Sequence, residues 1–418
     1  MQKLIIKGKK KLSGSINISG SKNATLPILA ASILTDQSLI LKNIPLVQDV
    51  YTMINLLKFI GLEVEISKRK NTLNISNYKT LKTVAPYNLL KTMRAGVLVL
   101  GPLLAKYKKA KVSLPGGCAI GTRPVNLHLF ALEKLGAKIK IKDGYIYASA
   151  KNGLKGSTIK FPSISVGATE NAILAAVSAK GKTIISNCAI EPEIQDMILF
   201  LNKIGCDINF IGKRKISIIG TNKFKDASHE IIFDRIELGT YLIAGALVGK
   251  KIILNKIKSS IIDTEIRILK KMGVKMKVEK NRITVFESKK INNISIKTEA
   301  YPGFPTDLQA QIMVLMSKAA GKSKVKENIF ENRFMHVPEL KRMGAKINTK
   351  NNTAIITGPT NLSGAEVMAT DLRASVSLVL AALVADNKTI INRVYHLDRG
   401  YEDLEKKLKK CKAEIKRI

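Results

Sequence analysis

The sequence predicts an α/β protein with two domains, built from six copies of one supersecondary unit. The first observation is a recurring signature: Leu, two mostly polar residues, an apolar residue, Gly, a small or apolar residue, a polar residue and an apolar one. Its copies lie 68 to 75 residues apart and centre on Gly61, Gly136, Gly205, Gly273, Gly344 and, with the glycine replaced, Lys412. An apolar, helix-like segment and a β-rich run precede the signature. Repeats of this length need neighbouring copies to bury their apolar faces, so the units are expected to share cores.

Each unit is predicted as helix, strand, helix, strand and strand. The first helices are the apolar segments at 24–34, 92–105, 168–179, 236–248, 307–320 and 372–385. Runs rich in β-branched residues follow at 39–43, 183–187, 252–255 and 389–392. The signature glycine then falls where a second helix ends, a position that favours glycine because its backbone is often left-handed.

A further strand is expected before the first helix of several units, at 14–19, 156–160 and 364–368. Strand–helix–strand connections of this length favour parallel, right-handed crossovers. With three units per globule, we expect one domain at 22–232 and a second at 1–21 plus 233–418. The first strand of the chain would complete the second globule, and the linkers would lie near 19–22 and 229–234.

Composition excludes several classes of protein. The chain has 418 residues, 45% of them hydrophobic, which is enough for more than one core. It has no apolar run long enough for a membrane span or for a signal sequence, so we expect a cytoplasmic protein without a membrane partner. The four cysteines show no metal or redox spacing, which fits a reducing compartment and predicts no metal site.

The net charge of +38 would favour a nucleic-acid partner if the lysines were clustered. They are spread along the whole chain, and aromatic residues make up only 5%. This pattern, together with abundant Ile and Asn, indicates a genome-wide compositional bias. We therefore expect no nucleic-acid partner.

Charged and small residues gather where the six first helices begin. They are Lys22, Asn23, Arg94, Ser165 to Thr169, Asp234, Arg235, Asp307, Asp371 and Arg373. Each alone is explained by ordinary capping. Together they indicate an anion site, because helix N-termini present free amide donors and a partial positive charge.

The segment Leu114-Pro-Gly-Gly-Cys118 has the composition of a mobile loop, and Arg123 follows five residues after the thiol. A nearby cation favours the thiolate, and such a loop can close over a substrate. The other cysteines, Cys188, Cys206 and Cys411, have apolar neighbours and are expected to be unreactive. Cys118 is the reactive candidate.

Seven motifs in order resemble one enzyme family from end to end. They are Ser19-Gly-Ser-Lys22-Asn23-Ala, Lys91-Thr-Met-Arg94-Ala, the Cys118 loop, Gly121-Thr-Arg123-Pro-Val-Asn-Leu127-His128, Phe304-Pro-Thr-Asp307, Glu331-Asn-Arg333-Phe-Met-His336 and His396-Leu-Asp-Arg399-Gly. The family is UDP-N-acetylglucosamine 1-carboxyvinyltransferase. The resemblance implies two inside-out α/β barrels of βαβαββ repeats, each with pseudo-threefold symmetry, and an active site in the cleft between them.

The resemblance also implies the reaction. The carboxyvinyl group of phosphoenolpyruvate would move to the 3-hydroxyl of UDP-N-acetylglucosamine by addition and elimination, the first committed step of peptidoglycan synthesis. No cofactor is implied, the partners would be these two small molecules, and we expect a monomer.

Roles are carried over residue by residue. Cys118 would donate a proton to C3 of phosphoenolpyruvate and can form a 2-(S-cysteinyl)pyruvate adduct, while Asp307 would be the base for the sugar hydroxyl. Lys22 and Arg399 complete the catalytic set. The resemblance implies that phosphoenolpyruvate binds Lys22, Asn23, Arg123, Arg333, Arg373 and Arg399, with Arg333 and Arg373 at its carboxylate.

The nucleotide sugar would contact a second set of residues. They are Asn23, Arg94, Arg123, Pro124, Val125, Asn126, Leu127, Ser163, Ile164, Ser165, Val166, Asp307 and Ile329. Many relatives have a lysine where this chain has Ser163, and Lys160 is out of register with it, so one diphosphate contact is in question. Asp371 and His396 are further site candidates, whereas His128 and His336 fit either the site or the support of loops.

Two other functions fit parts of the sequence. An enolpyruvyl transferase acting on shikimate 3-phosphate would share the repeats, the lysine and the arginines, but would not need the Cys118 loop. A scaffold descended from the enzyme is disfavoured because every residue with a chemical role is present.

Overall fold

The chain forms two compact units. The computed structural model describes residues 2–77, 80–116 and 125–418. Unit I comprises the described residues between Gly20 and Ile232, and unit II those up to Ser19 together with Phe233–Ile418. Each unit is built from the same repeated element.

Within the described residues, a four-stranded sheet of one topology occurs six times, three times in each unit. In the third sheet of unit I, β10 (Thr158–Lys160) runs parallel to β11 (Lys182–Ser186). β13 (Lys215–Ile219) pairs antiparallel with β11 and with the edge strand β12 (Asp207–Gly212). Because helices lie between the first three strands in sequence, the unit reads βαβαββ, which confirms the predicted repeat.

Unit I contains two further sheets and the helices that pack on them. The sheets have the orders β14-β3-β5-β4 and β6-β7-β9-β8. The strands are β3 (Leu39–Lys42), β4 (Glu63–Ser67), β5 (Thr72–Ser76), β6 (Val84–Ala85), β7 (Lys109–Ser113), β8 (Lys138–Lys142), β9 (Tyr145–Ser149) and β14 (Ala227–Glu230). The helices are α1 (Lys22–Ala31), η1 (Ser32–Leu34), α2 (Gln48–Ile60), α3 (Tyr87–Leu90), η2 (Arg94–Val99), α4 (Leu100–Tyr107), α5 (Asn126–Lys134), α6 (Val166–Ala176) and α7 (Pro192–Lys203).

Unit II has sheets of the orders β16-β17-β15-β2, β18-β19-β21-β20 and β22-β23-β1-β24. The strands are β1 (Leu4–Lys7), β2 (Leu12–Asn17), β15 (Gly249–Asn255), β16 (Met276–Glu279), β17 (Arg282–Phe286), β18 (Ser295–Lys297), β19 (Gly321–Lys326), β20 (Lys346–Lys350), β21 (Thr353–Gly358), β22 (Glu366–Met368), β23 (Lys388–Asn392) and β24 (Glu414–Arg417). The helices are α8 (Arg235–Val248), η3 (Ser259–Ile262), α9 (Asp263–Lys271), η4 (Thr306–Leu308), α10 (Gln309–Met316), α11 (Val337–Arg342), α12 (Leu372–Val384), α13 (Tyr395–Asp398) and α14 (Leu404–Lys410).

Three strands join repeats that are distant in sequence. β1 lies between β23 and β24 and takes the fourth-strand place of the last repeat, which confirms that the start of the chain completes the second globule. The strand expected at 14–19 is present as β2 and precedes α1 in sequence, but it pairs in parallel with β15 of unit II and so does not supply the first strand of the repeat that contains α1. That place is taken by β14, which pairs in parallel with β3. A strand at Ala227–Glu230 was not among the expected elements, and local sequence does not specify the partner of either strand.

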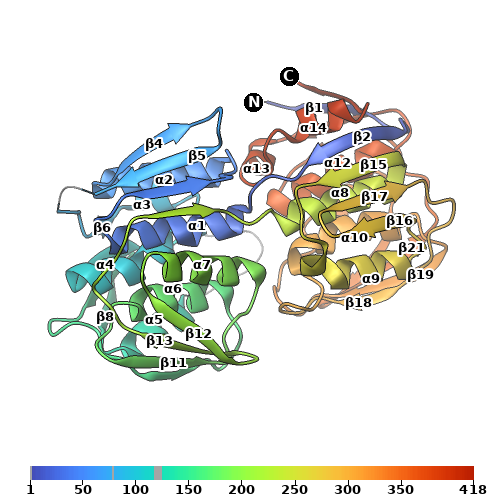
Figure 1. Cartoon of the computed structure of the whole chain (residues 1–418). Coiled ribbons are helices and arrows are strands. Elements are labelled where there is room, and N and C mark those ends of the chain that lie inside the picture. Colours follow the sequence, from blue (N-terminus) through green and yellow to red (C-terminus); the bar gives the residue numbers. More distant parts are fainter. Residues whose placement is uncertain (1, 78–79, 117–124) are drawn as a thin grey trace. The chain divides into compact units, whose positions relative to one another are not determined.

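The inner helices of each unit are apolar on all sides. In unit II, α8, α10 and α12 contact one another and lie among the strands (Figure 1). Every residue of α12 is buried, and α1 and α6 are nearly as enclosed in unit I. Helices without a polar face belong in a core, whereas outer helices such as α2 alternate buried and exposed faces. The six apolar segments of the sequence are these inner helices.

The signature glycines have the predicted conformation. Gly61, Gly136, Gly205, Gly273 and Gly344 have φ between 85° and 125°. Lys412 stands at the same place with φ 71°, a left-handed backbone that is uncommon for a residue with a Cβ. Among the described residues, the search for helices both long and apolar enough to cross a membrane finds none.

Candidate active site

In unit II, Asp307 joins two buried arginines. Its carboxylate oxygens each accept a hydrogen bond of 2.7 Å, Oδ1 from Nη2 of Arg333 and Oδ2 from Nη2 of Arg373. The arginine side chains are 4% and 6% exposed, while Asp307 is 25% exposed. Three predicted site residues from two successive repeats therefore meet, with Asp307 and Arg333 in one repeat and Arg373 in the next, and together they carry one net positive charge.

Helix starts position these side chains. Asp307 lies in η4, directly before α10, and Arg373 lies in the first turn of α12. Asp371 caps α12, since its Oδ1 accepts hydrogen bonds from the backbone N–H groups of Arg373 (2.8 Å) and Ala374 (3.1 Å). Burial alone would lower the pKa of Arg373, but the charge of Asp307 raises it, so this guanidinium stays protonated.

The remaining predicted residues of unit II are electrostatic neighbours of this group. His396 lies in α13, just before Arg399, and its pKa is lowered by burial and by Arg399 while Asp371 opposes the shift. Burial and the charge of Arg333 lower the pKa of His336, and the charge of Asp371 opposes this shift. His336 and His396 therefore lie near Asp371 at the start of α12, with Arg333 beside His336 and Arg399 beside His396. Ile329 is an exposed residue of the segment after β19.

His336 supports the segment that carries Arg333. It is buried and hydrogen-bonded to the backbone of Arg333, and burial, more than any other cause, lowers its pKa to about 4. A neutral histidine that holds the Arg333 backbone fits the loop-supporting role rather than contact with substrate.

The lowered pKa of His336 predicts a loss of stability in mild acid. An unfolded histidine titrates near pH 6.5, so the unfolded chain binds more protons than the folded chain between about pH 6.5 and pH 4. Stability is therefore complete above pH 6.5 and falls as the pH drops, by about 2 kcal/mol between pH 7 and pH 5 from this residue. Urea unfolding at the two pH values should show a pH dependence weaker by about that amount in His336→Gln, and equal dependence in both proteins would contradict the prediction.

In unit I, Lys22 opens α1 and faces a carboxylate. Ser21 caps the helix, accepting a hydrogen bond of 3.3 Å from the backbone N–H of Ala24. Lys22 Nζ lies 3.1 Å from Oδ2 of Asp49, and both residues are buried. Asn23 follows on the same turn and is half-buried. A buried lysine at a helix N-terminus, held by one aspartate, suits a phosphate ligand.

A second group in unit I surrounds the start of α6. Ser165 is the N-cap, Ser163, Ile164 and Val166 beside it are exposed, and Asn126 and Leu127 begin α5. His128 of α5 accepts at Nδ1 a hydrogen bond of 3.1 Å from the side-chain amide of Asn171. Desolvation and the charge of Arg94 lower the pKa of His128 to about 4. Arg94, His128 and the α6 N-terminus are therefore neighbours.

Close packing explains one glycine of this subsite. A Cβ on Gly167 would lie 3.1 Å from Cε1 of His128, so the ring occupies the space that a side chain would take. Val125 and Leu127 are half-buried beside it. Cys118, Arg123 and Pro124 lie outside the described residues.

The three other cysteines are buried and free. Burial raises the pKa of Cys188 and of Cys411 to about 11 and that of Cys206 to about 12. At neutral pH these buried thiols are protonated, which agrees with the expectation that they are unreactive. Among the described residues, no three His, Cys, Asp or Glu side chains come together as a metal site.

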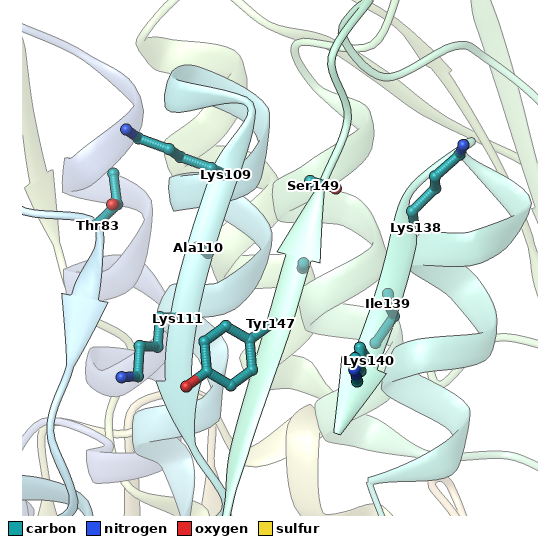
Figure 2. A pocket seen from close by; sticks show the side chains of 10 residues that line it. Thr83, Lys109, Ala110, Lys111, Lys138, Ile139, Lys140, Tyr147 and Ser149 are labelled. Atoms are coloured by element: carbon teal, nitrogen blue, oxygen red, sulfur yellow. The ribbon is translucent and has the colours of Figure 1, made fainter. Parts of the chain in front are cut away.

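A hollow of about 390 Å³ lies elsewhere, over the sheet β6-β7-β9-β8. Figure 2 shows Lys109 and Lys111 on one strand, Lys138 and Lys140 on another, and Tyr147 between the two strands. None of the predicted site residues lines it, and lysines of this kind occur on several other strands of this basic chain. We regard the hollow as a solvated sheet face.

Sequence reasoning did not find the hydrogen bonds around the Tyr401 hydroxyl, which contacts Arg373. The hydroxyl of Tyr401 accepts a hydrogen bond of 3.2 Å from Arg373 Nη1, and Thr240 and Gln311 lie within hydrogen-bonding distance of the same hydroxyl. A signal was present, because a polar residue inside an otherwise apolar helix requires a buried hydrogen-bond partner.

The fold of six βαβαββ repeats, with Asp307 between two buried arginines, is that of an enolpyruvyl transferase. The chain belongs to the EPSP synthase (3-phosphoshikimate 1-carboxyvinyltransferase) family, whose model matches residues 6–408. Curated relatives are more specific. UDP-N-acetylglucosamine 1-carboxyvinyltransferase of Pelagibacter ubique is 60% identical over 418 residues, which cover 100% of both chains. The enzyme of the same name from Rickettsia bellii is 52% identical over 422 residues, again with 100% of both chains covered.

Solved structures confirm the fold. The enolpyruvyl transferase NikO from Streptomyces tendae matches with a TM-score of 0.92 at 23% identity, over 100% of this chain and 98% of that chain. EPSP synthase from Acinetobacter baumannii matches with a TM-score of 0.79 at 17% identity, over 100% and 99%. At these identities the likeness shows the shared architecture of βαβαββ repeats and not the substrate.

Proposed function

We propose that this chain transfers the enolpyruvyl group of phosphoenolpyruvate to the 3-hydroxyl of UDP-N-acetylglucosamine and releases phosphate. The observation that carries the proposal is the carboxylate of Asp307 held between the buried guanidinium groups of Arg333 and Arg373. Full-length relatives at 52% and 60% identity are named for this reaction. The reaction would be the first committed step of peptidoglycan synthesis, in the cytoplasm.

Arg333 and Arg373 are proposed to bind the carboxylate of phosphoenolpyruvate. Guanidinium groups offer paired donors that match a carboxylate, and both groups are already desolvated. In the free protein each binds one oxygen of Asp307. A substrate carboxylate that takes over these donors would release Asp307 to accept the proton of the sugar hydroxyl.

Lys22, Asn23, Arg123 and Arg399 are proposed to bind the phosphate. The hydroxyl oxygen would attack C2, Cys118 would protonate C3, and the tetrahedral intermediate would then lose phosphate as C3 returns the proton. Residues of both units take part in this scheme. No cofactor takes part, and the chain acts as a monomer.

The nucleotide sugar is proposed to bind near the α6 N-terminus, where Ser163 to Val166, Arg94 and Asn126 lie. The dipole of that helix favours the diphosphate. Because Ser163 lacks the charge of the lysine found in relatives, the helix N-terminus and Arg94 would carry more of the diphosphate binding.

Phosphate release tests this function. Wild type and Cys118→Ala are assayed with phosphoenolpyruvate and either UDP-N-acetylglucosamine or shikimate 3-phosphate. Release only with the UDP-sugar, and strongly reduced in Cys118→Ala, would support the proposal. Release with shikimate 3-phosphate would assign the other acceptor, and release with neither acceptor would overturn both.

A thiol reagent should modify the native protein at one residue. We expect iodoacetamide at pH 7 to label Cys118, because the other three thiols are buried and their pKa values are raised to about 11 or 12. Peptide mass spectrometry measures the label at each cysteine. Cys118→Ala is the control and should remain unlabelled until it is denatured, whereas label on Cys188, Cys206 or Cys411 in native protein would contradict the prediction.

A further inference from the structure

The hydroxyl of Tyr401 is the point where the three inner helices of unit II meet. It lies 2.9 Å from Oγ1 of Thr240 in α8, 3.4 Å from Nε2 of Gln311 in α10 and 3.2 Å from Nη1 of Arg373 in α12. Tyr401 itself is buried and follows α13 in sequence. One side chain therefore joins the beginnings of helices from three repeats.

The hydrogen-bond directions follow from the partners. Thr240 donates to the backbone oxygen of Ile236 at 2.8 Å, so its Oγ1 accepts from Tyr401. The lone pairs of the phenol oxygen then face Arg373, which has only donors, and the side-chain amide of Gln311. Burial raises the pKa of Tyr401, so the phenol keeps the proton that this arrangement needs.

Arg373 is consequently held at both ends of its fork. Nη1 donates to Tyr401 and Nη2 donates to Asp307, and the guanidinium carbon lies 5.6 Å from the centre of the Tyr401 ring. Gln311 also donates to the backbone oxygen of Asp307 at 2.8 Å, which connects both partners of the arginine. A substrate that displaces Asp307 leaves Tyr401 as the anchor.

We propose that Tyr401 is a positioning residue that orients Arg373 for the carboxylate of phosphoenolpyruvate. The inference rests on the proposed function and adds a residue that acts through Arg373 without touching the reacting atoms. Arg333 provides a contrast in the same site, since the aromatic ring against it belongs to Phe330, which has no hydroxyl. Orientation by a phenol is thus specific to one of the two arginines.

The chain offers a matched control at the next residue of α8 after Thr240. Tyr241 is also buried, and within the described residues its hydroxyl has no hydrogen-bond partner. Tyr241→Phe and Tyr401→Phe thus remove the same atom from the same core, but only Tyr401→Phe removes a contact to Arg373. A general effect of a missing core hydroxyl would appear in both variants.

Steady-state kinetics with both substrates test the inference. In Tyr401→Phe we expect the KM for phosphoenolpyruvate to rise about tenfold, the usual worth of a hydrogen bond to a charged group, with the KM for UDP-N-acetylglucosamine within about twofold of wild type. Tyr241→Phe should match wild type for both. In an Arg373→Lys background, Tyr401→Phe should add less than about twofold, because residues that act through one another are not additive.

Several results would overturn it. Equal increases in both KM values would indicate general loosening, and a Tyr401→Phe enzyme with the kinetics of Tyr241→Phe would leave the proposed function intact but remove the role of Tyr401. If Tyr401→Phe fails to fold, Thr240→Val, which removes the acceptor of the phenol proton, must raise the same KM selectively or the inference fails. A wild type inactive with the UDP-sugar overturns the proposed function and this inference with it.

Discussion

Replacing Asp307 by Asn is expected to reduce turnover by about 10²- to 10⁴-fold, the usual contribution of a positioned base. Asparagine keeps the shape and one carbonyl oxygen for Arg333 or Arg373, but it cannot accept the proton of the sugar hydroxyl. It also removes the negative charge that the two buried guanidinium groups share. The carboxylate of phosphoenolpyruvate then no longer competes with a charged Asp307 for the two guanidinium groups. We therefore expect the KM for phosphoenolpyruvate to stay constant or fall.

Phosphate release over a range of both substrates measures the two effects separately. Asp263→Asn is the matched control, because Asp263 is an exposed acid in the first turn of α9 in the same unit. It should leave kcat unchanged. A folded Asp307→Asn enzyme with wild-type kcat and a raised KM for phosphoenolpyruvate would show that Asp307 organises the arginines and is not the base.

The repeat was predictable because it is a local pattern. Periodic signatures, apolar segments and glycines with positive φ all depend on neighbours a few residues away, and Gly61 and Gly344 have the backbone that the pattern implies. The partners of strands are not local. β2 was expected as a strand and β14 was not, and only the packing of complete units places β2 beside β15 and β14 beside β3.

The residues of the site could be predicted from the sequence, but the contacts between them could not. Helix starts were visible in sequence, and the resemblance assigned Asp307, Arg333 and Arg373 to a common function. Their contacts join residues 26 and 66 positions apart, which no spacing rule specifies. Tyr401 and Thr240 escaped notice because a tyrosine and a threonine in apolar surroundings are usual in a core. Their role appears only when the three helices are seen to meet at one hydroxyl.

Replacing Lys407 by Met is expected to destabilise the protein by about 3 to 5 kcal/mol, because it leaves a buried carboxylate without its cation. Lys407 Nζ lies 2.6 Å from Oε1 of Glu237 and donates at 2.6 Å to Oγ of Ser19. The two charged side chains are only 15% and 3% exposed. The backbone N–H of Ser19 also donates to Glu237, at 2.8 Å, but this bond alone does not balance the charge.

The loss should depend on pH in a defined direction. Burial already raises the pKa of Glu237 against the effect of Lys407, and without the lysine the carboxyl would hold its proton more strongly. The folded variant then binds a proton that the unfolded chain releases, so its stability falls as the pH rises from about 5 to 8. Urea unfolding at both pH values should show the larger deficit at pH 8.

Lys406→Met is the control, because it removes a neighbouring lysine of α14 that does not contact Glu237. Lys406 pairs with Asp403 at 2.8 Å, but the two side chains are 69% and 54% exposed, so its removal should cost far less stability than the removal of Lys407. Adding Glu237→Gln to Lys407→Met removes the stranded charge and should recover part of the stability and most of the pH dependence. Equal losses in Lys406→Met and Lys407→Met, or a double variant as unstable as Lys407→Met at pH 8, would show that the ion pair with Glu237 is not what stabilises this part of unit II.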